Sequence, residues 1–253
     1  MRMAAANPAS RLLSGGAALL ATSVLADSAM EHYRGSFHNP AMVAPIGMSL
    51  LAIGNNGAQA VGAPGVMPVH VLSVAIGAAG LGFHAYDILV RPGGLRLLNL
   101  FYAAPIGAPA ALTLAGLLGG AARTAPNGRL VGTIVAGGLI GTVCEAGLLH
   151  FRGAYHNPAM WLPVALPPLA AVSLALDVMA GSASRRSCVL LVATALLGIV
   201  GAAFHVYGVS RNMGGWRNWR QNLLAGPPIP APPAFTGLAI AGWGALRMLP
   251  RHG

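Results

Sequence analysis

Long apolar stretches, separated by short polar connectors, make up most of this chain. A helix rises about 1.5 Å per residue, so a stretch of about 20 apolar residues can cross the hydrocarbon core of a bilayer. The connectors, such as residues 62–65 and 125–128, are rich in glycine and proline. The pattern predicts eight membrane-spanning helices, at residues 11–31, 40–61, 68–90, 97–121, 130–150, 159–181, 188–210 and 223–249.

The composition agrees with a bilayer as the solvent. Charged residues make up 8% of the 253 residues, hydrophobic residues make up 55%, and the mean hydropathy is +0.66. A soluble domain contains about 25% charged residues. All 15 basic residues are arginine, which excludes a retinal Schiff base and lysine-based covalent catalysis. The net charge of +10 comes from arginines that stand singly between apolar stretches, and this distribution argues against a nucleic-acid surface.

One polar string occurs twice in the chain. His32–Met42 (HYRGSFHNPAM) returns as His150–Met160 (HFRGAYHNPAM), identical at eight of eleven positions. Further matches follow in the later predicted helices, so we expect residues 1–124 and 125–253 to be two copies of a four-helix unit. Because four is an even number, both copies enter the membrane in the same direction. The predicted fold is therefore an all-α, polytopic membrane protein of two tandem four-helix bundles, related by a pseudo-twofold axis along the membrane normal.

The arginine distribution indicates the orientation. When the repeat-matched Arg34, Arg96, Arg152 and Arg217 are set aside, a cytoplasmic N-terminus leaves eight arginines inside and three outside. We therefore expect a bacterial-type inner membrane protein with its N-terminus in the cytoplasm. The first apolar stretch resembles a signal peptide, but its repeat counterpart lies deep inside the chain. We expect this stretch to be retained as the first helix.

Candidate functional residues gather at the outer face of this topology. Six of the eight histidines are repeat-matched: His32, His38 and His84 in the first half, and His150, His156 and His205 in the second. A carboxylate is also matched, Asp27 with Glu145, and an ionisable group inside a membrane usually has a specific partner. The arginines named above are candidates to pair with an anion or a haem propionate. Supporting polar residues are Asn39, Tyr86, Asn157 and Tyr207.

Three interpretations of these residues stand open from the sequence. In the first, helix-borne histidines such as His32 and His84 are the axial ligands of a b-type haem. In the second, the histidines bind copper, iron or zinc directly, with the carboxylate as a ligand or as the hydrogen-bond partner of one. In the third, nothing binds: Asn39 and Asn157 cap helices that begin at the following proline, and the histidines bond to loop carbonyls.

The matched histidines favour a membrane redox or electron-transfer protein that exchanges electrons with a quinone or a periplasmic dehydrogenase subunit. If it is an enzyme, we expect a membrane-bound metal- or haem-dependent oxidoreductase. No catalytic residue can be assigned from the sequence. Two other classes stay open: a transporter or channel built from two repeats, and a non-catalytic membrane anchor for a partner subunit. Transport sites lie near the midplane of the bilayer, whereas these histidines lie near one surface.

The triplets Asn39–Ala41 and Asn157–Ala159 resemble those of aquaporins, which start two half-helices in repeats of opposite topology. In this chain one predicted span precedes the first triplet, where that family has two. Met160 and Trp161 follow the second triplet, where that family has an arginine. The resemblance covers three residues in each half, so we do not assign the chain to that family.

Overall fold

The computed structural model describes residues 7–124 and 127–250. Within these two ranges every regular element is a helix, which confirms the predicted all-α class for the described residues. The elements are α1 (Pro8–Arg34), η1 (Pro40–Val43), α2 (Ala44–Ala60), α3 (Met67–Val90), α4 (Leu97–Tyr102), α5 (Gly107–Arg123), α6 (Gly128–Arg152), η2 (Pro158–Trp161), α7 (Leu162–Ala180), α8 (Arg185–Arg211), η3 (Gly215–Asn218), α9 (Trp219–Ala225) and α10 (Pro233–Leu246), where η marks a 3-10 helix.

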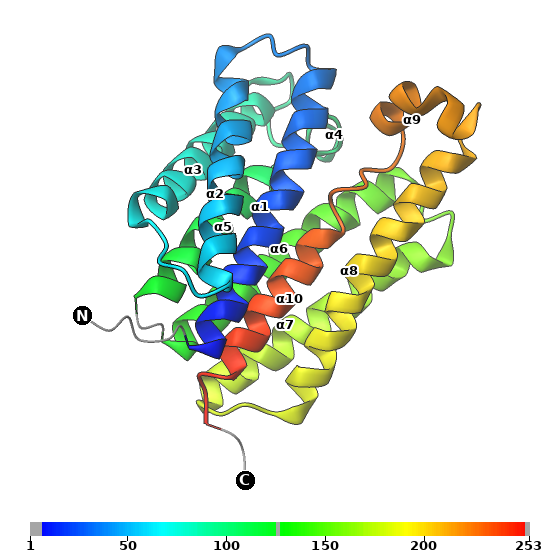
Figure 1. Ribbon diagram of the computed structural model, residues 1–253. Coiled ribbons are helices and arrows are strands. Elements are labelled where there is room, and N and C mark those ends of the chain that lie inside the picture. Colours follow the sequence, from blue (N-terminus) through cyan, green and yellow to red (C-terminus); the bar gives the residue numbers. More distant parts are fainter. Residues whose placement is uncertain (1–6, 125–126, 251–253) are drawn as a thin grey trace.

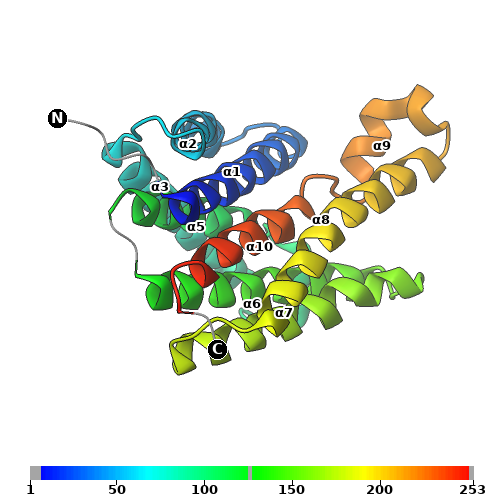
Figure 2. The same cartoon turned by 60° about the horizontal axis from the view of Figure 1, so that its bottom comes forward.

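The long helices run between two ends of the molecule (Figure 1). α1 begins and α10 ends at one of these ends, and the short helices α4 and α9 lie at the other. α1 packs against α2, α5 and α10, and α10 packs in turn against α6 and α8. Figure 2 shows α10 between α1 and the group that contains α6, α7 and α8. α1 and α10 therefore hold the two parts of the chain, residues 7–124 and 127–250, together.

A close helix crossing joins α1 to α10. A Cβ atom added at Gly16 would overlap the carbonyl oxygen of Gly237, and one added at Gly237 would lie 2.9 Å from the carbonyl oxygen of Gly16. Small residues at such crossings let two helix backbones approach, which is a common way for helices to associate within a membrane. Buried leucines, among them Leu20 and Leu238, surround the crossing.

Within residues 7–124 and 127–250, five helical segments are long and apolar enough to span a membrane: α1, α3, α6, η2 with α7, and α8. By the length and composition of these helices, the chain is a multi-pass membrane protein. α2 and α5 contain 17 residues each and α10 contains 14, fewer than the about 20 that a full span needs. Eight spans are therefore not confirmed.

Two of the predicted spans are interrupted. The stretch 97–121 divides into α4 and α5 around Pro105, and the stretch 223–249 divides into α9 and α10 across residues 226–232. Proline lacks a backbone N–H and disrupts the preceding turn of a helix, although its apolar neighbours preserve the hydropathy of the stretch. The two-bundle arrangement and its boundary at residue 124 stay predictions.

The two repeated strings adopt the same local structure. After α1, Ser36 and Phe37 have positive φ angles of 56° and 46°, and after α6, Ala154 and Tyr155 have the same two values. The chain then enters η1 and η2, each of which begins at a proline. This turn places the second half of each string beside the end of the helix that precedes it.

The asparagines of the strings cap these 3-10 helices. The side-chain oxygens of Asn39 and Asn157 accept hydrogen bonds from the backbone N–H groups of Ala41 and Ala159, both at 2.9 Å. Capping satisfies a backbone donor that has no partner within the helix. The expected helix starts are thus present, and the asparagines are occupied by this architecture.

Candidate functional site

Four of the six repeated histidines lie in the last third of long helices: His32 in α1, His84 in α3, His150 in α6 and His205 in α8. His32 and His150 stand in the last turns of α1 and α6. His84 and His205 lie six residues before the ends of α3 and α8, which finish at the same end as α1 and α6. The expectation that the six matched histidines form one functional site stays a prediction.

Every one of the six matched histidines directs its Nδ1 atom to a backbone carbonyl. His32 and His150 bond to the carbonyl oxygens of Met42 and Met160 at 2.6 and 2.9 Å. His84 and His205 bond to the carbonyl oxygens of Pro105 and Pro228 at 2.5 and 2.6 Å. The more exposed His38 and His156 bond to Gly35 and Gly153 at 3.1 and 3.0 Å.

These bonds determine the tautomer of each ring. A carbonyl oxygen only accepts, so Nδ1 must carry the hydrogen, and in the neutral imidazole the Nε2 atom then keeps a free lone pair. An Nδ1–H bond to a backbone carbonyl is also the usual way in which proteins orient an imidazole that binds a metal through Nε2. Each matched histidine is therefore held with its ligand nitrogen available.

One pair of the matched histidines has its rings in contact. The ring centroids of His150 and His205 lie 6.5 Å apart, with an angle of 76° between the ring planes. His32 and His84 are within electrostatic range of each other in the first half. In the part of the chain that the structure describes, no group of three or more His, Cys, Asp or Glu side chains is arranged to hold a metal ion.

The matched carboxylates differ in their partners. Glu145 accepts a hydrogen bond from the backbone N–H of Gly107, the first residue of α5, at 3.1 Å. No described residue forms a hydrogen bond or an ion pair with Asp27, although it lies within electrostatic range of Glu145. Arg34 forms an ion pair with Glu31 at 3.0 Å instead. The two carboxylates thus occupy matched positions in different environments.

Aromatic contacts join the two parts of the chain at this end. The Nη1 atom of Arg152 donates to the carbonyl oxygen of Phe101 at 2.9 Å, and its guanidinium lies 5.7 Å from the ring centroid of Tyr102. In the reverse direction, Arg220 of α9 donates to the hydroxyl of Tyr33 and lies over its ring. Short helices of each part therefore contact the string of the other. Sequence reasoning missed Phe101 and Tyr102, because aromatic residues near a membrane surface are common. It also missed the role of Arg220.

The other predicted site residues lie farther out. Arg96 and Arg217 are exposed, at the start of α4 and within η3. Tyr86 and Tyr207 are 66% and 57% exposed, and Tyr207 accepts a hydrogen bond from Arg211 at 3.1 Å. These residues surround the histidine end without a contact to the rings.

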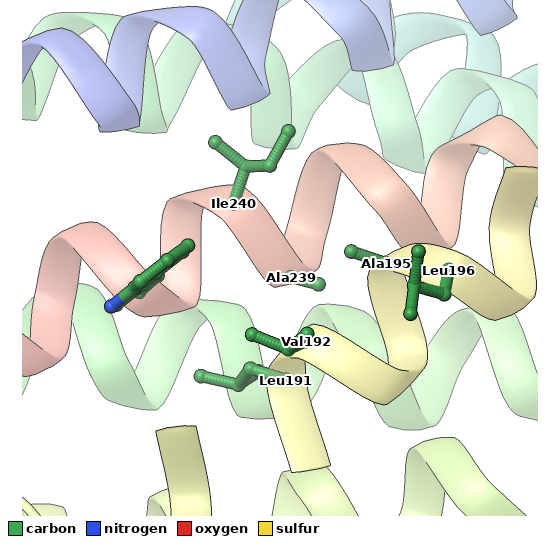
Figure 3. A pocket seen from close by; sticks show the side chains of 7 residues that line it. Leu191, Val192, Ala195, Leu196, Ala239 and Ile240 are labelled. Carbon is green, nitrogen blue, oxygen red and sulfur yellow. The ribbon is translucent and has the colours of Figure 1, made fainter. Parts of the chain in front are cut away.

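Two apolar hollows lie away from the histidines. One, of about 120 Å³, is bordered by α8 and α10; Figure 3 shows its lining side chains, including Leu191, Leu196 and Ile240. The other, of about 270 Å³, lies between α3 and α5, and the unmatched His70 is part of its lining. Neither is lined by any of the six matched histidines, so the candidate site rests on the histidine pairs themselves.

Comparison with known proteins gives no match: no protein-family model, no curated protein and no solved structure matches this chain. The function is therefore argued from the residues and geometry of the chain itself.

Proposed function

We propose that the chain is a membrane redox or electron-transfer protein that binds b-type haem between paired histidines near one membrane surface. The observation that supports this best is the shared arrangement of the histidines: each Nδ1 is bonded to a backbone carbonyl and each Nε2 is free. A hydrogen bond from Nδ1–H to a carbonyl oxygen fixes the orientation of the ring and raises the basicity of Nε2 as a ligand. Four histidines with this arrangement come from the ends of four helices.

The number of ligands favours haem over a metal ion held by the protein alone. A zinc site takes three or four protein ligands, and no such group is found among the described residues. A porphyrin supplies four nitrogens itself, so two imidazoles complete the iron. Metal–imidazole bonds are about 2 Å long, which brings the centroids of two rings that share one metal to roughly 6 Å. His150 and His205 are 6.5 Å apart.

We assign one centre to each half, His32 with His84 and His150 with His205. Arg34, Arg96, Arg152 and Arg217 are assigned to the haem propionates, because a guanidinium pairs well with a carboxylate at a membrane surface. The proposal includes the tandem four-helix repeats, an inner membrane, a periplasmic histidine end and a cytoplasmic N-terminus. The electron partner is a quinone or a periplasmic dehydrogenase subunit.

The absorption spectrum and metal content of protein purified in detergent, after expression with haem and metals supplied, test this proposal. We expect a six-coordinate haem spectrum that splits sharply on reduction. His150→Ala and His205→Ala should each remove about half of the absorbance. The matched control is His156→Ala, which removes a similarly bonded but exposed histidine and should keep the full spectrum.

Other outcomes identify the alternatives. A colourless protein without metal contradicts every cofactor assignment. Bound copper, zinc or non-haem iron without porphyrin replaces haem by a directly bound metal. A measured solute flux that survives loss of the histidines favours a transporter, and a stable complex with a dehydrogenase that tolerates alanine at all six histidines favours an anchor.

A further inference from the structure

The carboxylates Asp27 and Glu145 stand within otherwise apolar helices. Asp27 lies seven residues before the end of α1, and Glu145 seven residues before the end of α6. The Asp27 carboxyl is largely buried inside the bundle, while the residue as a whole keeps some exposed surface. An ionisable side chain at such a depth is costly and marks a functional site more often than a structural one.

A single difference between the repeats separates their environments. The motif Pro105-Ile-Gly-Ala-Pro109 before α5 corresponds to Pro228-Ile-Pro-Ala-Pro232 before α10, so that Pro230 stands where the first copy has Gly107. Gly107 donates its N–H to Glu145, and a Cβ atom at Gly107 would overlap that carboxylate. Proline has no N–H to donate. The second motif therefore cannot cap a carboxylate in the same way.

Asp27 faces the motif that lacks the donor. Ser23, one turn earlier on α1, donates its hydroxyl hydrogen to the carbonyl oxygen of Pro230 at 2.6 Å. Residues four apart share one face of a helix, so Asp27 lies on the face of α1 that runs beside this motif. No described residue offers Asp27 a hydrogen bond. A carboxylate without a donor in an apolar surrounding gains stability by binding a proton.

The charges around Asp27 strengthen this conclusion. The groups that face it are Glu145 of α6 and Glu31 and Arg34 of its own helix, and Arg34 is paired with Glu31. The sequences of α2 and α10, which pack on α1, contain no acidic or basic residue, and Arg123 stands at the far end of α5. α9 also contacts α1, and its Arg220 bonds to Tyr33 near the end of α1. Two carboxylates that lie near each other in a medium of low dielectric do not both ionise readily.

We propose that the Asp27 carboxyl is a buried site that holds one exchangeable proton, influenced by the charge of Glu145, and that Asp27 takes up this proton when the histidine centre is reduced. The electron comes from a quinol or a dehydrogenase subunit and lowers the charge of the centre by one. The proton comes from water at the membrane surface and converts a carboxylate to a carboxyl, so the embedded charge is restored. The redox half of this inference rests on the proposed function, whereas the proton site does not.

The motifs before α5 and α10 connect the carboxylates to the histidines. The carbonyl oxygen of Pro105 accepts from His84, and two residues later Gly107 donates to Glu145. The carbonyl oxygen of Pro228 accepts from His205, and that of Pro230 accepts from Ser23. A change of charge at Glu145 therefore acts directly on the short segment that also orients His84, whereas Asp27 stands one turn after Ser23, the residue that bonds to the segment orienting His205.

Infrared spectroscopy of the full-length protein in lipid nanodiscs tests the proton site without any cofactor. In the haem-free protein, and in reduced protein that holds haem, we expect at neutral pH the carbonyl stretch of a protonated carboxyl group, shifted on exchange into D2O. Asp27→Asn should remove or strongly reduce this band, and Glu145→Gln should alter it because the partner charge is gone. The control is Asp87→Asn, since Asp87 is 45% exposed at its side chain and forms an ion pair with Arg91.

A second measurement tests the coupling. If haem is bound, the midpoint potential of the native protein should fall by about 59 mV per pH unit, the value for one proton per electron, and this dependence should vanish in Asp27→Asn. No carboxyl band in the haem-free or reduced protein, or a band unchanged in Asp27→Asn, overturns the proton site. A band that behaves as expected beside a potential that is independent of pH overturns the coupling alone. A protein without haem that shows the expected band refutes the proposed redox function and leaves the proton site standing.

Discussion

The contact between Gly107 and Glu145 makes a sharp prediction about stability. In Gly107→Ala the added methyl group overlaps the Glu145 carboxylate, so that the carboxylate must move and its hydrogen bond to the start of α5 is lost. A hydrogen bond to a charged group contributes about 1.5–3 kcal/mol, and the positive end of a helix adds to the attraction. We expect a loss of about 2 kcal/mol, which is roughly a thirtyfold change in the ratio of folded to unfolded protein.

Equilibrium unfolding in mixed detergent micelles, followed by tryptophan fluorescence, measures this loss. Gly141→Ala is the matched control, because Gly141 lies on the same helix as Glu145 and has nothing within 4 Å of its added Cβ. The double variant Gly107→Ala/Glu145→Ala should be no less stable than Glu145→Ala, since the obstructing carboxylate is absent. If Gly107→Ala unfolds at the same detergent fraction as Gly141→Ala, the close contact between Gly107 and Glu145 does not exist.

Two further predictions concern the contacts between the two parts of the chain. Gly237→Ala forces α10 away from the backbone of α1 and should cost about 1–3 kcal/mol of unfolding free energy. In the control Gly47→Ala the added methyl group enters open space, so this variant should be neutral or stabilising. Equal stability of the two variants contradicts the close crossing. Arg152→Ala removes the hydrogen bond and ring contact to α4 at Phe101 and Tyr102. It should cost about 1 kcal/mol, seen as earlier proteolysis around α4, and unchanged proteolysis would show that α4 is held by other contacts.

Hydropathy predicted the long helices well because a helix in lipid satisfies its own backbone hydrogen bonds and needs only an apolar stretch of sufficient length. The predicted stretches 130–150 and 188–210 correspond to α6 and α8. The same reasoning failed at Pro105 and across residues 226–232, where the stretch is apolar but the backbone cannot remain helical. A hydropathy average does not register a missing N–H, which accounts for two of the three expected spans that are absent from the five long apolar helices of the described residues. The third, at 40–61, is represented by α2, which has 17 residues.

The candidate site was likewise predictable from the sequence only in part. Internal similarity alone identified the four histidines of the pairs, since residues recurring at matched positions of two helices end at one level of the bundle. It could not show which atom each ring would offer. The carbonyls of Pro105 and Pro228, twenty or more residues away along the chain, determine that Nδ1 is used and that Nε2 is free. Such pairings depend on how helices pack rather than on any local pattern.

The sequence by itself determined that this chain is helical, suited to a membrane, and provided with a repeated set of histidines and carboxylates. These properties follow from composition, length and repetition, which act locally along the chain. Only the tertiary structure decided that the rings of His150 and His205 meet and that the two carboxylates differ. The reason is physical: Glu145 meets a glycine that donates an N–H, whereas Asp27 lies on a face beside the motif with Pro230, which has none.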